Sequence, residues 1–520
     1  MSLFNKLFSN KDNGNKQDKK QQEQKLKIDK SVDKNIDNVK STLNGNFDVI
    51  TRKVSLGGKT DQYVVLAYLD GMVDKTVLNQ SILRPIVLKP VDDEKFRKVG
   101  PLQYVEEFMI TANDVSELDK FSDCIDDIFN GCTIVFVDGC DKALVCDTKG
   151  WKERSIDEPG NEAIAMGPHM GFNETLLTNV TMIRRYIRDP NLHFEPMTIG
   201  RSGKTDVVIA FIDGIADDNI VNEVKKRIQQ IDIDAVIDSS YIAELISDAP
   251  LSPFATLQST ERPDKVVANI LEGKVAIFVD STPVVLVAPF LFWEFIQSPD
   301  DYYENSIISS GVRVLRVLSL FIAVFLPGFY ISIVSFNQEM IPTRFILSLM
   351  SGRLFVPFSP FAEVFLMMVL IEILREAGIH FPGTIGQTIS IVGALVVGQS
   401  AVSAGLVSPF VVIIISVTTL ASYAVPSYTA SYMMRFLPYP VLIVSALLGI
   451  YGFAWCMLAL LIHIASLRSF GIPYLTPVAP FRLIDNKDTL LRMPRWLMKY
   501  RPSFINAENK KRMATKKKGE

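Results

Sequence analysis

The chain has 520 residues, with 54 Lys or Arg, 57 Asp or Glu and a formal net charge of -3. This length allows about three domains that each bury a core. The near-zero charge hides basic residues that gather toward both ends, over 6–40 and 482–518. Because these basic ends flank apolar segments, they favour a location on the cytoplasmic side of a membrane, where they meet anionic lipid. Binding to nucleic acid is the weaker interpretation.

The five cysteines contain no C-x-x-C pair and show no paired framework of a secreted protein. They predict reduced, structural thiols in a reducing compartment. The N-terminus is polar and Lys-rich and lacks the apolar stretch of a cleavable secretory signal. We therefore expect the part of the chain before the apolar segments to stay in the cytoplasm.

Residues 1–44 are rich in Asn, Lys, Gln and Asp and have few aromatic side chains. A segment of this composition buries too little apolar area to offset the conformational entropy lost on folding. We expect a Lys-rich tail that is disordered or loosely helical.

The next part of the chain contains an internal duplication. The string VVLAYLDGMVD at 64–74 recurs as VVIAFIDGIAD at 207–217, and IVFVD at 134–138 recurs as AIFVD at 276–280. Their offsets of 143 and 142 residues agree on one register. Each apolar run ends in Asp, which is typical of a strand that is buried on both faces and closed by a turn.

Helical periodicity follows the first strand of each copy. In the second copy the apolar positions are Ile220, Val221, Val224, Ile228 and Ile231. Alternating strands and helices predict a soluble α/β head made of two duplicated subdomains, at 45–150 and 191–300.

Residues 151–190 are predicted to connect the two subdomains, because Glu-Pro-Gly and Gly-Pro are turn sequences. The connector includes an amphipathic helix around Leu176–Ile187. The connector is rich in polar residues, so a contact with a partner protein is also considered. The candidate residues for this contact are Glu158, His169, Arg184 and Arg185.

The remainder is apolar enough for a membrane. Val317–Phe336 contains no charged residue over twenty residues, and at about 1.5 Å per residue it matches a hydrocarbon core of about 30 Å. Four more apolar segments follow, at 360–373, 385–407, 410–425 and 439–467. We expect an α-helical polytopic transmembrane domain at 301–470 and a basic cytoplasmic C-terminal tail at 471–520.

The predicted number of crossings is four to six. Five crossings would place the two basic ends on opposite sides, against the charge rule. Either one segment, the second or the third, is re-entrant or interfacial, or Val284–Phe295 also inserts.

Polar groups within these segments are candidates for a pore or for helix packing. Glu372 has Arg375 three residues away as a local partner, whereas Glu363 needs a partner, a water-filled path or the interface. The third segment carries a ladder of small residues that lets helices approach closely, together with two amides. The candidates are Glu363, Glu372, Gly386, Gln387, Ser390, Ala394, Gly398, Gln399 and Gly405.

The sequence contains no complete catalytic motif among those considered. Gly57-Gly-Lys-Thr60 lacks the glycine that a P-loop requires at position 53, where Lys53 stands. The four histidines are too scattered along the chain for a metal set. We expect no enzyme, no cofactor and no metal site.

Six separated motifs resemble the A subunit of GerA-type spore germination proteins. They are RSIDEP at 154–159, GPHMGFNE at 167–174, STERPD at 259–264, VDSTP at 279–283, SIVGALVVGQ at 390–399 and SFGIPY at 469–474. The resemblance covers about residues 45–498. His169 departs from the family pattern, in which we expect Arg.

The resemblance implies a germinant receptor subunit in the inner membrane of the bacterial spore. Its expected partners are a transporter-like membrane B subunit, which recognises the nutrient, and a lipoprotein C subunit. The A subunit is expected to form a homo-oligomer, a pentamer with a central ion path, and the alternative is a scaffold that assembles the complex without conducting.

Overall fold

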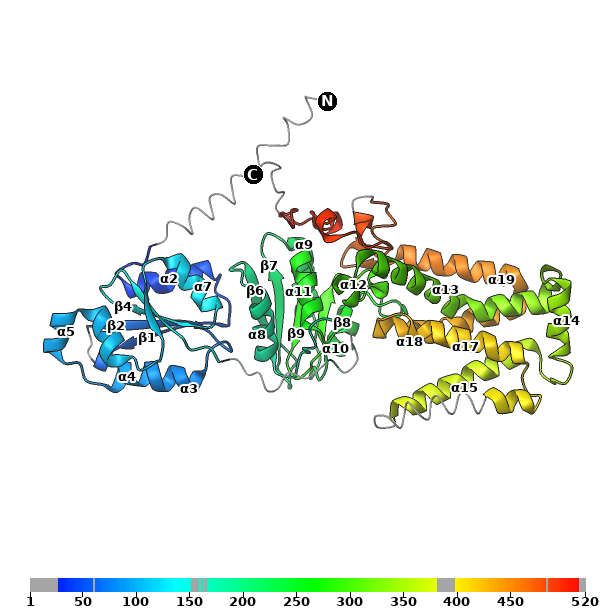
Figure 1. Ribbon diagram of the computed structural model, residues 1–520, viewed down its shortest axis with the longest axis horizontal. Helices are drawn as coiled ribbons and strands as arrows, with labels where there is room; N and C mark the ends of the chain where they lie inside the picture. The colour runs from blue at the N-terminus through cyan, green and yellow to red at the C-terminus, as the bar shows by residue number, and fades with distance from the viewer. Residues whose placement is uncertain are drawn as a thin grey trace, which may run out of the picture. The chain divides into compact units, whose positions relative to one another are not determined.

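The computed structural model describes residues 27–58, 61–150, 159, 162, 166–380, 398–482 and 485–513. They fall into two compact units, which are described separately (Figure 1). The globular unit comprises residues up to 159 with 169–243 and 260–287. The helical unit comprises 160–168, 244–259 and 288 onward.

The first subdomain of the globular unit is built around a five-stranded sheet. Its strands are β1 (Val49–Ser55), β2 (Tyr63–Leu69), β3 (Val115–Leu118), β4 (Thr133–Val137) and β5 (Ala143–Cys146). Its helices are α2 (Val32–Thr42), η1 (Leu56–Gly58), α3 (Lys75–Val77), η2 (Leu78–Leu83), α4 (Arg84–Leu88), α5 (Asp93–Val99), α6 (Pro101–Tyr104), η3 (Val105–Met109) and α7 (Phe121–Phe129). The strand order is β1-β2-β4-β5-β3, and all neighbours are antiparallel.

The sheet of the first subdomain is covered on both faces. α2 and α7 pack on one face, and the helices between β2 and β3 pack on the other (Figure 1). β4 is consequently buried at every position, as its continuous apolar sequence predicts.

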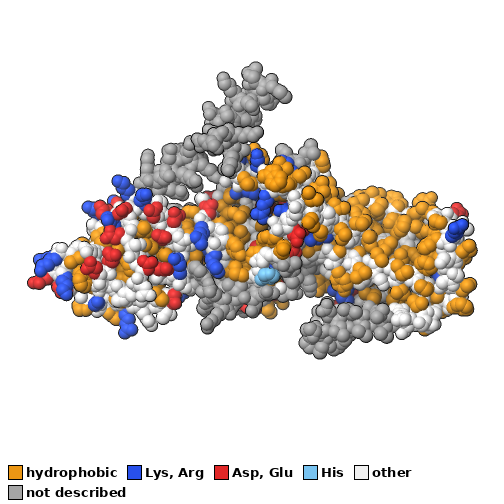
Figure 2. Space-filling view, viewed as in Figure 1, with side chains coloured by type: hydrophobic (Ala, Val, Ile, Leu, Met, Phe, Trp, Pro, Cys, Tyr) orange, Lys and Arg blue, Asp and Glu red, His pale blue; other side chains and the backbone are white. Residues whose placement is uncertain are grey.

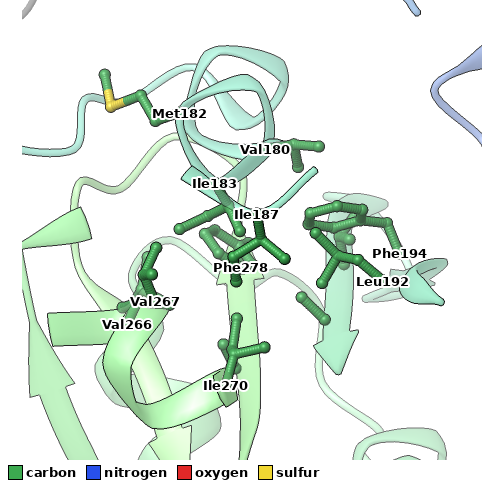
Figure 3. Close-up of a cluster of buried hydrophobic side chains, with 14 of the residues drawn as sticks. Val180, Met182, Ile183, Ile187, Leu192, Phe194, Val266, Val267, Ile270 and Phe278 are labelled. Atoms are coloured by element: carbon green, nitrogen blue, oxygen red, sulfur yellow. The ribbon is translucent and has the colours of Figure 1, made fainter. Parts of the chain in front are cut away.

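The second subdomain repeats this architecture. It contains α8 (Leu176–Tyr186), β6 (Leu192–Ile199), β7 (Thr205–Ile212), α9 (Asp218–Gln229), α10 (Ser239–Ile246), β8 (Gln258–Thr260), α11 (Pro263–Glu272), β9 (Val275–Val279) and β10 (Val285–Ala288). The strand order is β6-β7-β9-β10-β8. Figure 3 shows one core of this subdomain, where the fully buried Ile183 of α8, Ile270 of α11 and Phe278 of β9 come together.

The two sheets have equivalent strand orders, which confirms the predicted duplication. The repeat also includes the helix before each sheet. Asp29 N donates to Asn35 Oδ1 at 2.9 Å and Asn35 Nδ2 donates to Asp29 O at 2.7 Å. Asn179 of α8 makes the same two hydrogen bonds with the backbone of Asn173, at 2.9 and 2.6 Å.

This helix corrects two predicted boundaries. Part of the tail predicted over 1–44 is the helix α2, whose Val32 and Val39 are buried in the first core. The helix of the predicted connector over 151–190 is α8, which belongs to the core of the second subdomain. The remaining residues of these two predictions, 1–26 and most of 151–165, lie outside the described residues.

The described part of the helical unit contains long and short helices. They are η4 (Phe292–Ile296), α12 (Asp300–Tyr303), α13 (Ser306–Phe336), η5 (Gln338–Met340), α14 (Thr343–Ser351), α15 (Pro360–His380), α17 (Pro409–Tyr423), α18 (Tyr428–Phe436) and α19 (Pro438–Ser466). α13 packs against both α17 and α19. Figure 2 shows hydrophobic side chains covering most of this unit's visible face, whereas the first subdomain shows mixed acidic and basic side chains.

Within the described residues, two helical stretches are long and apolar enough to cross a membrane, Ser306–Phe336 and Ala430–Ser466. α17 is apolar but shorter. The two stretches include the first and the last predicted segments, and the total of four to six crossings stays a prediction.

One alternative for the start of the helical unit is excluded, and the described C-terminal part is folded. Val284–Phe295 does not form an additional span, because β10 is a buried strand of the second sheet and η4 follows it. In the C-terminal part, whose cytoplasmic location stays a prediction, the described residues form the short strands β11 (Arg468–Ser469) and β12 (Ile472–Pro473) and the turns η6 (Asp485–Lys487), η7 (Arg495–Leu497) and η8 (Ser503–Ile505). Tyr474 is fully buried and its hydroxyl donates to the carbonyl of Ala255 at 2.6 Å.

Candidate functional site: buried charges of the helical unit

Glu363 lies in the first turn of α15 and is completely buried. Arg353 places its Nη2 atom 3.0 Å from Glu363 Oε1. The backbone N–H of Ser408, at the start of α17, donates to Glu363 Oε2 at 2.9 Å. A helix N-terminus favours a negative charge, so α17 and Arg353 together stabilise a carboxylate that would otherwise be costly to bury.

Glu372 lies farther along α15 and belongs to a separate cluster. Arg435 of α18 donates from Nε to Glu372 Oε1 at 2.7 Å and places Nη2 3.2 Å from Glu376 Oε2. Arg375 is also present, with Nη1 3.7 Å from Glu372 Oε2. The predicted local pair with Arg375 therefore exists, but the closer partner comes from another helix.

This second cluster borders a small cavity of about 40 Å³ between α15, α17, α18 and α19. Polar groups from α17 face it, since Thr418 and Ser422 line the cavity beside Arg375. The Arg375 side chain also lies over the ring of Tyr423, 5.2 Å from its centre. The arrangement holds two acidic and two basic groups among apolar helices, and Arg435 lies close to both carboxylates.

The small residues and amides of the third predicted segment are only partly described. Gly386, Gln387, Ser390 and Ala394 lie outside the described residues. Gly398 and the exposed Gln399 are in the described helical stretch 398–403.

The two described glycines of this segment differ. A Cβ atom at Gly398 would lie 3.7 Å from Val412 Cγ1, an ordinary contact. Gly405 has a φ of +67° and follows the end of the helix, so it does not belong to a helix-packing face as predicted. Its role is conformational, because few other residues adopt this backbone region.

The candidate partner contacts of the globular unit have different environments. His169 is exposed and Arg185 is partly buried, whereas Glu158 lies outside the described residues. Arg184 is only 1% exposed and is thus not available at the surface as predicted.

Arg184 joins the two subdomains. It donates from Nε to Asp48 Oδ2 at 2.8 Å and from Nη2 to Asp48 Oδ1 at 3.0 Å, in the bidentate geometry that makes such pairs strong. Its guanidinium also lies over the rings of Phe129 and Phe194, 5.8 and 4.7 Å from their centres. Asp48 belongs to the link between α2 and β1, so the pair fastens the first subdomain to α8 of the second.

His193 lies beside this junction. Its ring stacks on Phe211 with the centres 5.3 Å apart, and its Nε2 atom is 3.1 Å from Asn44 Nδ2. Burial lowers the pKa of His193, because desolvation disfavours the charged ring, although Asp213 acts in the opposite direction.

A further charged network lies at the start of α13. Arg313 and Arg316 each bond Asp301 at 2.8 Å, and Arg313 also bonds Asp488 Oδ1 at 2.8 Å. Arg313 is fully buried. Both arginines are therefore paired within the chain, and Arg313 ties the C-terminal part to α13.

Sequence reasoning missed the partners of these charges. Arg353 and Arg435 were not singled out, although Arg435 is the one Asp, Glu, Lys or Arg residue between Glu376 and Arg468 in the sequence. A lone charge in such an apolar stretch requires a partner, and this was the available signal.

Comparisons with known proteins give consistent results. The model of the family described as Bacillus/Clostridium GerA spore germination protein matches residues 37–504. Spore germination protein KA of Bacillus subtilis (strain 168) is 40% identical over 492 residues, which cover 95% of this chain and 90% of that protein. Spore germination protein B1 of the same organism is 39% identical over 489 residues, 93% of this chain and 99% of that protein.

A solved structure also matches part of the chain. The crystal structure of the N-terminal domain of the A subunit of the Bacillus megaterium spore germinant receptor GerK3 is 32% identical and covers 51% of this chain and 98% of that chain, with a TM-score of 0.41.

Proposed function

The chain belongs to the GerA family of spore germination proteins, and we propose that it is a germinant receptor A subunit that converts nutrient binding into ion release as part of an oligomeric membrane channel. The observation that carries this proposal is the pair of charge clusters on α15. Glu363 and Glu372 lie among helices whose surfaces are apolar. Ionisable groups at membrane depth are costly and mark ion pathways or polar contacts between helices.

In this proposal the subunit works with others in the inner membrane of the spore, with its duplicated globular unit in the cytoplasm. A transporter-like B subunit recognises the nutrient, a lipoprotein C subunit completes the receptor, and copies of the A subunit surround the ion path as a pentamer. Moving the channel from 1:99 to 99:1 open requires about 5.5 kcal/mol of differential binding, which several subunits acting together supply.

A scaffold that does not conduct is the second candidate function. One observation favours it: Glu363 and Glu372 both have arginine partners within the chain, as a statically packed bundle would require. In that case the ions pass through another subunit.

Cysteine scanning from 363 to 403 distinguishes the two functions. It uses the assembled receptor in proteoliposomes and a water-soluble thiol reagent, in a background where Cys140 and Cys456 are serine. A channel predicts a helical stripe of labelled positions whose modification blocks conductance. Leu447→Cys on α19, where the native side chain is 71% exposed and apolar, is the control that should stay unlabelled in lipid.

Two results would reject the channel: labelling without any periodic stripe, or a complete receptor that never conducts in a planar bilayer. Either result would leave the scaffold as the function.

A further inference from the structure

The described part of the helical unit contains a second, larger cavity, where α13 ends and α14 begins. Its volume is about 260 Å³, more than the roughly 150 Å³ of an apolar protein cavity that holds benzene. Its walls are mainly apolar and include Val334, Ile346 and Leu349, together with the polar side chain of Gln338. Met350 and Leu354 also line it and are exposed, so the cavity is open on one side. A molecule with a short hydrocarbon body fits such walls.

The polar end of this cavity is formed by Arg353, the partner of Glu363. Within the described residues its guanidinium engages Glu363 and Phe358 through Nη2, which lies 3.0 Å from Glu363 Oε1 and 3.5 Å from the carbonyl oxygen of Phe358. The side chain is 19% exposed, so the group is not sealed from the cavity. A guanidinium has five N–H donors and binds carboxylate or phosphate through two of them.

We propose that this cavity is a binding site for a small amphiphilic anion, whose carboxylate or phosphate group pairs with Arg353 while its apolar body lies against α13 and α14. The site would exist in a channel and in a scaffold alike, so the inference goes beyond the proposed function.

The position of Arg353 couples this site to Glu363. An anion in the cavity competes with Glu363 for the same guanidinium. Glu363 is fully buried, and its other oxygen is held by the backbone N–H of Ser408. Occupation of the cavity therefore weakens the hold of Arg353 on the start of α15 and favours arrangements in which Glu363 finds another partner.

The test uses the purified full-length protein and hexanoate as the probe, with hexanol as a neutral molecule of the same length. Hexanoate should bind at least tenfold more tightly than hexanol, a difference of about 1.4 kcal/mol, in a titration followed by calorimetry. Arg353→Gln should remove this preference. Arg344→Gln is the matched control, because Arg344 is an exposed arginine of α14 and does not line the cavity.

A second variant covers the case in which Arg353→Gln does not fold. Leu349 is 4% exposed and lines the cavity, and Leu349→Trp should fill it and abolish hexanoate binding while thermal unfolding remains cooperative. A lipid source is examined in nanodiscs of phosphatidylglycerol or phosphatidylcholine, followed by measuring which lipid is retained on purification.

Hexanoate binding that depends on Arg353 supports the site with a free anion as its ligand. Retention of phosphatidylglycerol that is lost in Arg353→Gln supports the site with a lipid headgroup as its ligand. Equal binding of hexanoate and hexanol, equal effects of Arg353→Gln and Arg344→Gln, or the absence of both kinds of binding would overturn the proposal.

Discussion

The ion pair between Asp48 and Arg184 is expected to be a main support of the globular unit. Both side chains are 1% exposed, so Asp48→Ala leaves a buried guanidinium without its carboxylate. Removing one partner of such a pair costs about 3–5 kcal/mol. With a shift of about 2–4 °C per kcal/mol for domains of this size, the melting temperature should fall by about 6–20 °C.

The buried thiols of the first subdomain provide the assay. A dye that fluoresces on reaction with thiols reports unfolding of this subdomain in the full-length protein during heating, in a background where Cys140 and Cys456 are serine. The reporters are the buried Cys124, Cys132 and Cys146. The control is Asp232→Ala, which removes an ion pair whose two side chains are 68% and 64% exposed and should leave the transition unchanged.

A double substitution separates the cost of an unpaired charge from the value of the pair. Asp48→Leu with Arg184→Met should recover much of the stability lost in Asp48→Ala, because apolar replacement of a buried pair is often neutral. The carbonyl oxygen of Leu192, which accepts from Arg184 at 3.2 Å, keeps a hydrogen bond from Asn46 at 3.1 Å. If Asp48→Ala melts no lower than Asp232→Ala, the reasoning about this junction is refuted.

Three further predictions follow from other groups. The pKa of His193 is lowered in the folded chain, so its contribution to the free energy of unfolding should be fully present above about pH 6.5 and be lost as the pH falls through the folded pKa. The melting temperature should therefore fall less between pH 8 and pH 5 in His193→Gln than in the unchanged protein, and parallel curves would contradict this. Burial raises the pKa values of Cys124, Cys132 and Cys146 to about 12, 11 and 12, so iodoacetamide at pH 8 should label these three thiols only after denaturation. Rapid labelling of the folded protein would contradict this. Arg435→Gln should lower the melting temperature of the full-length protein more than Arg375→Gln, because Arg435 lies closer to Glu372; an equal loss would show that the cluster does not depend on the link between helices.

The duplicated sheets could be predicted because their signal is local and repeated. A strand buried on both faces requires an unbroken apolar run, and β4 and β9 are both such runs, each buried at all five positions. The helix α2 could not be recognised in the same way. Its buried positions are Val32, Asn35 and Val39, and only two of these are apolar, which is too few to stand out in a Lys-rich sequence. It packs against β2 and β4 of the sheet, which are distant from it in the sequence.

The membrane segments were easier to recognise than the elements between them. α13 and α19 are long apolar runs, whereas α14 and α18 have nine residues each and are too short for a hydropathy signal. The short helix α18 carries Arg435, and the turn after α14 carries Arg353. The missed elements are thus the ones that supply the partners of Glu372 and Glu363.

The charged pairs show how far sequence reasoning reaches and where it stops. A buried carboxylate or guanidinium must find an opposite charge or several hydrogen bonds, since its desolvation is otherwise uncompensated. One residue in the sequence is enough to show that a partner is needed, but it does not identify the partner. The partner lies 63 positions away in the sequence for Glu372 and 136 positions away for Asp48. Each pair then restricts the fold, because Glu372 with Arg435 requires α15 to lie against α18. A lone charge in an apolar segment therefore indicates a contact between elements that are distant in the sequence.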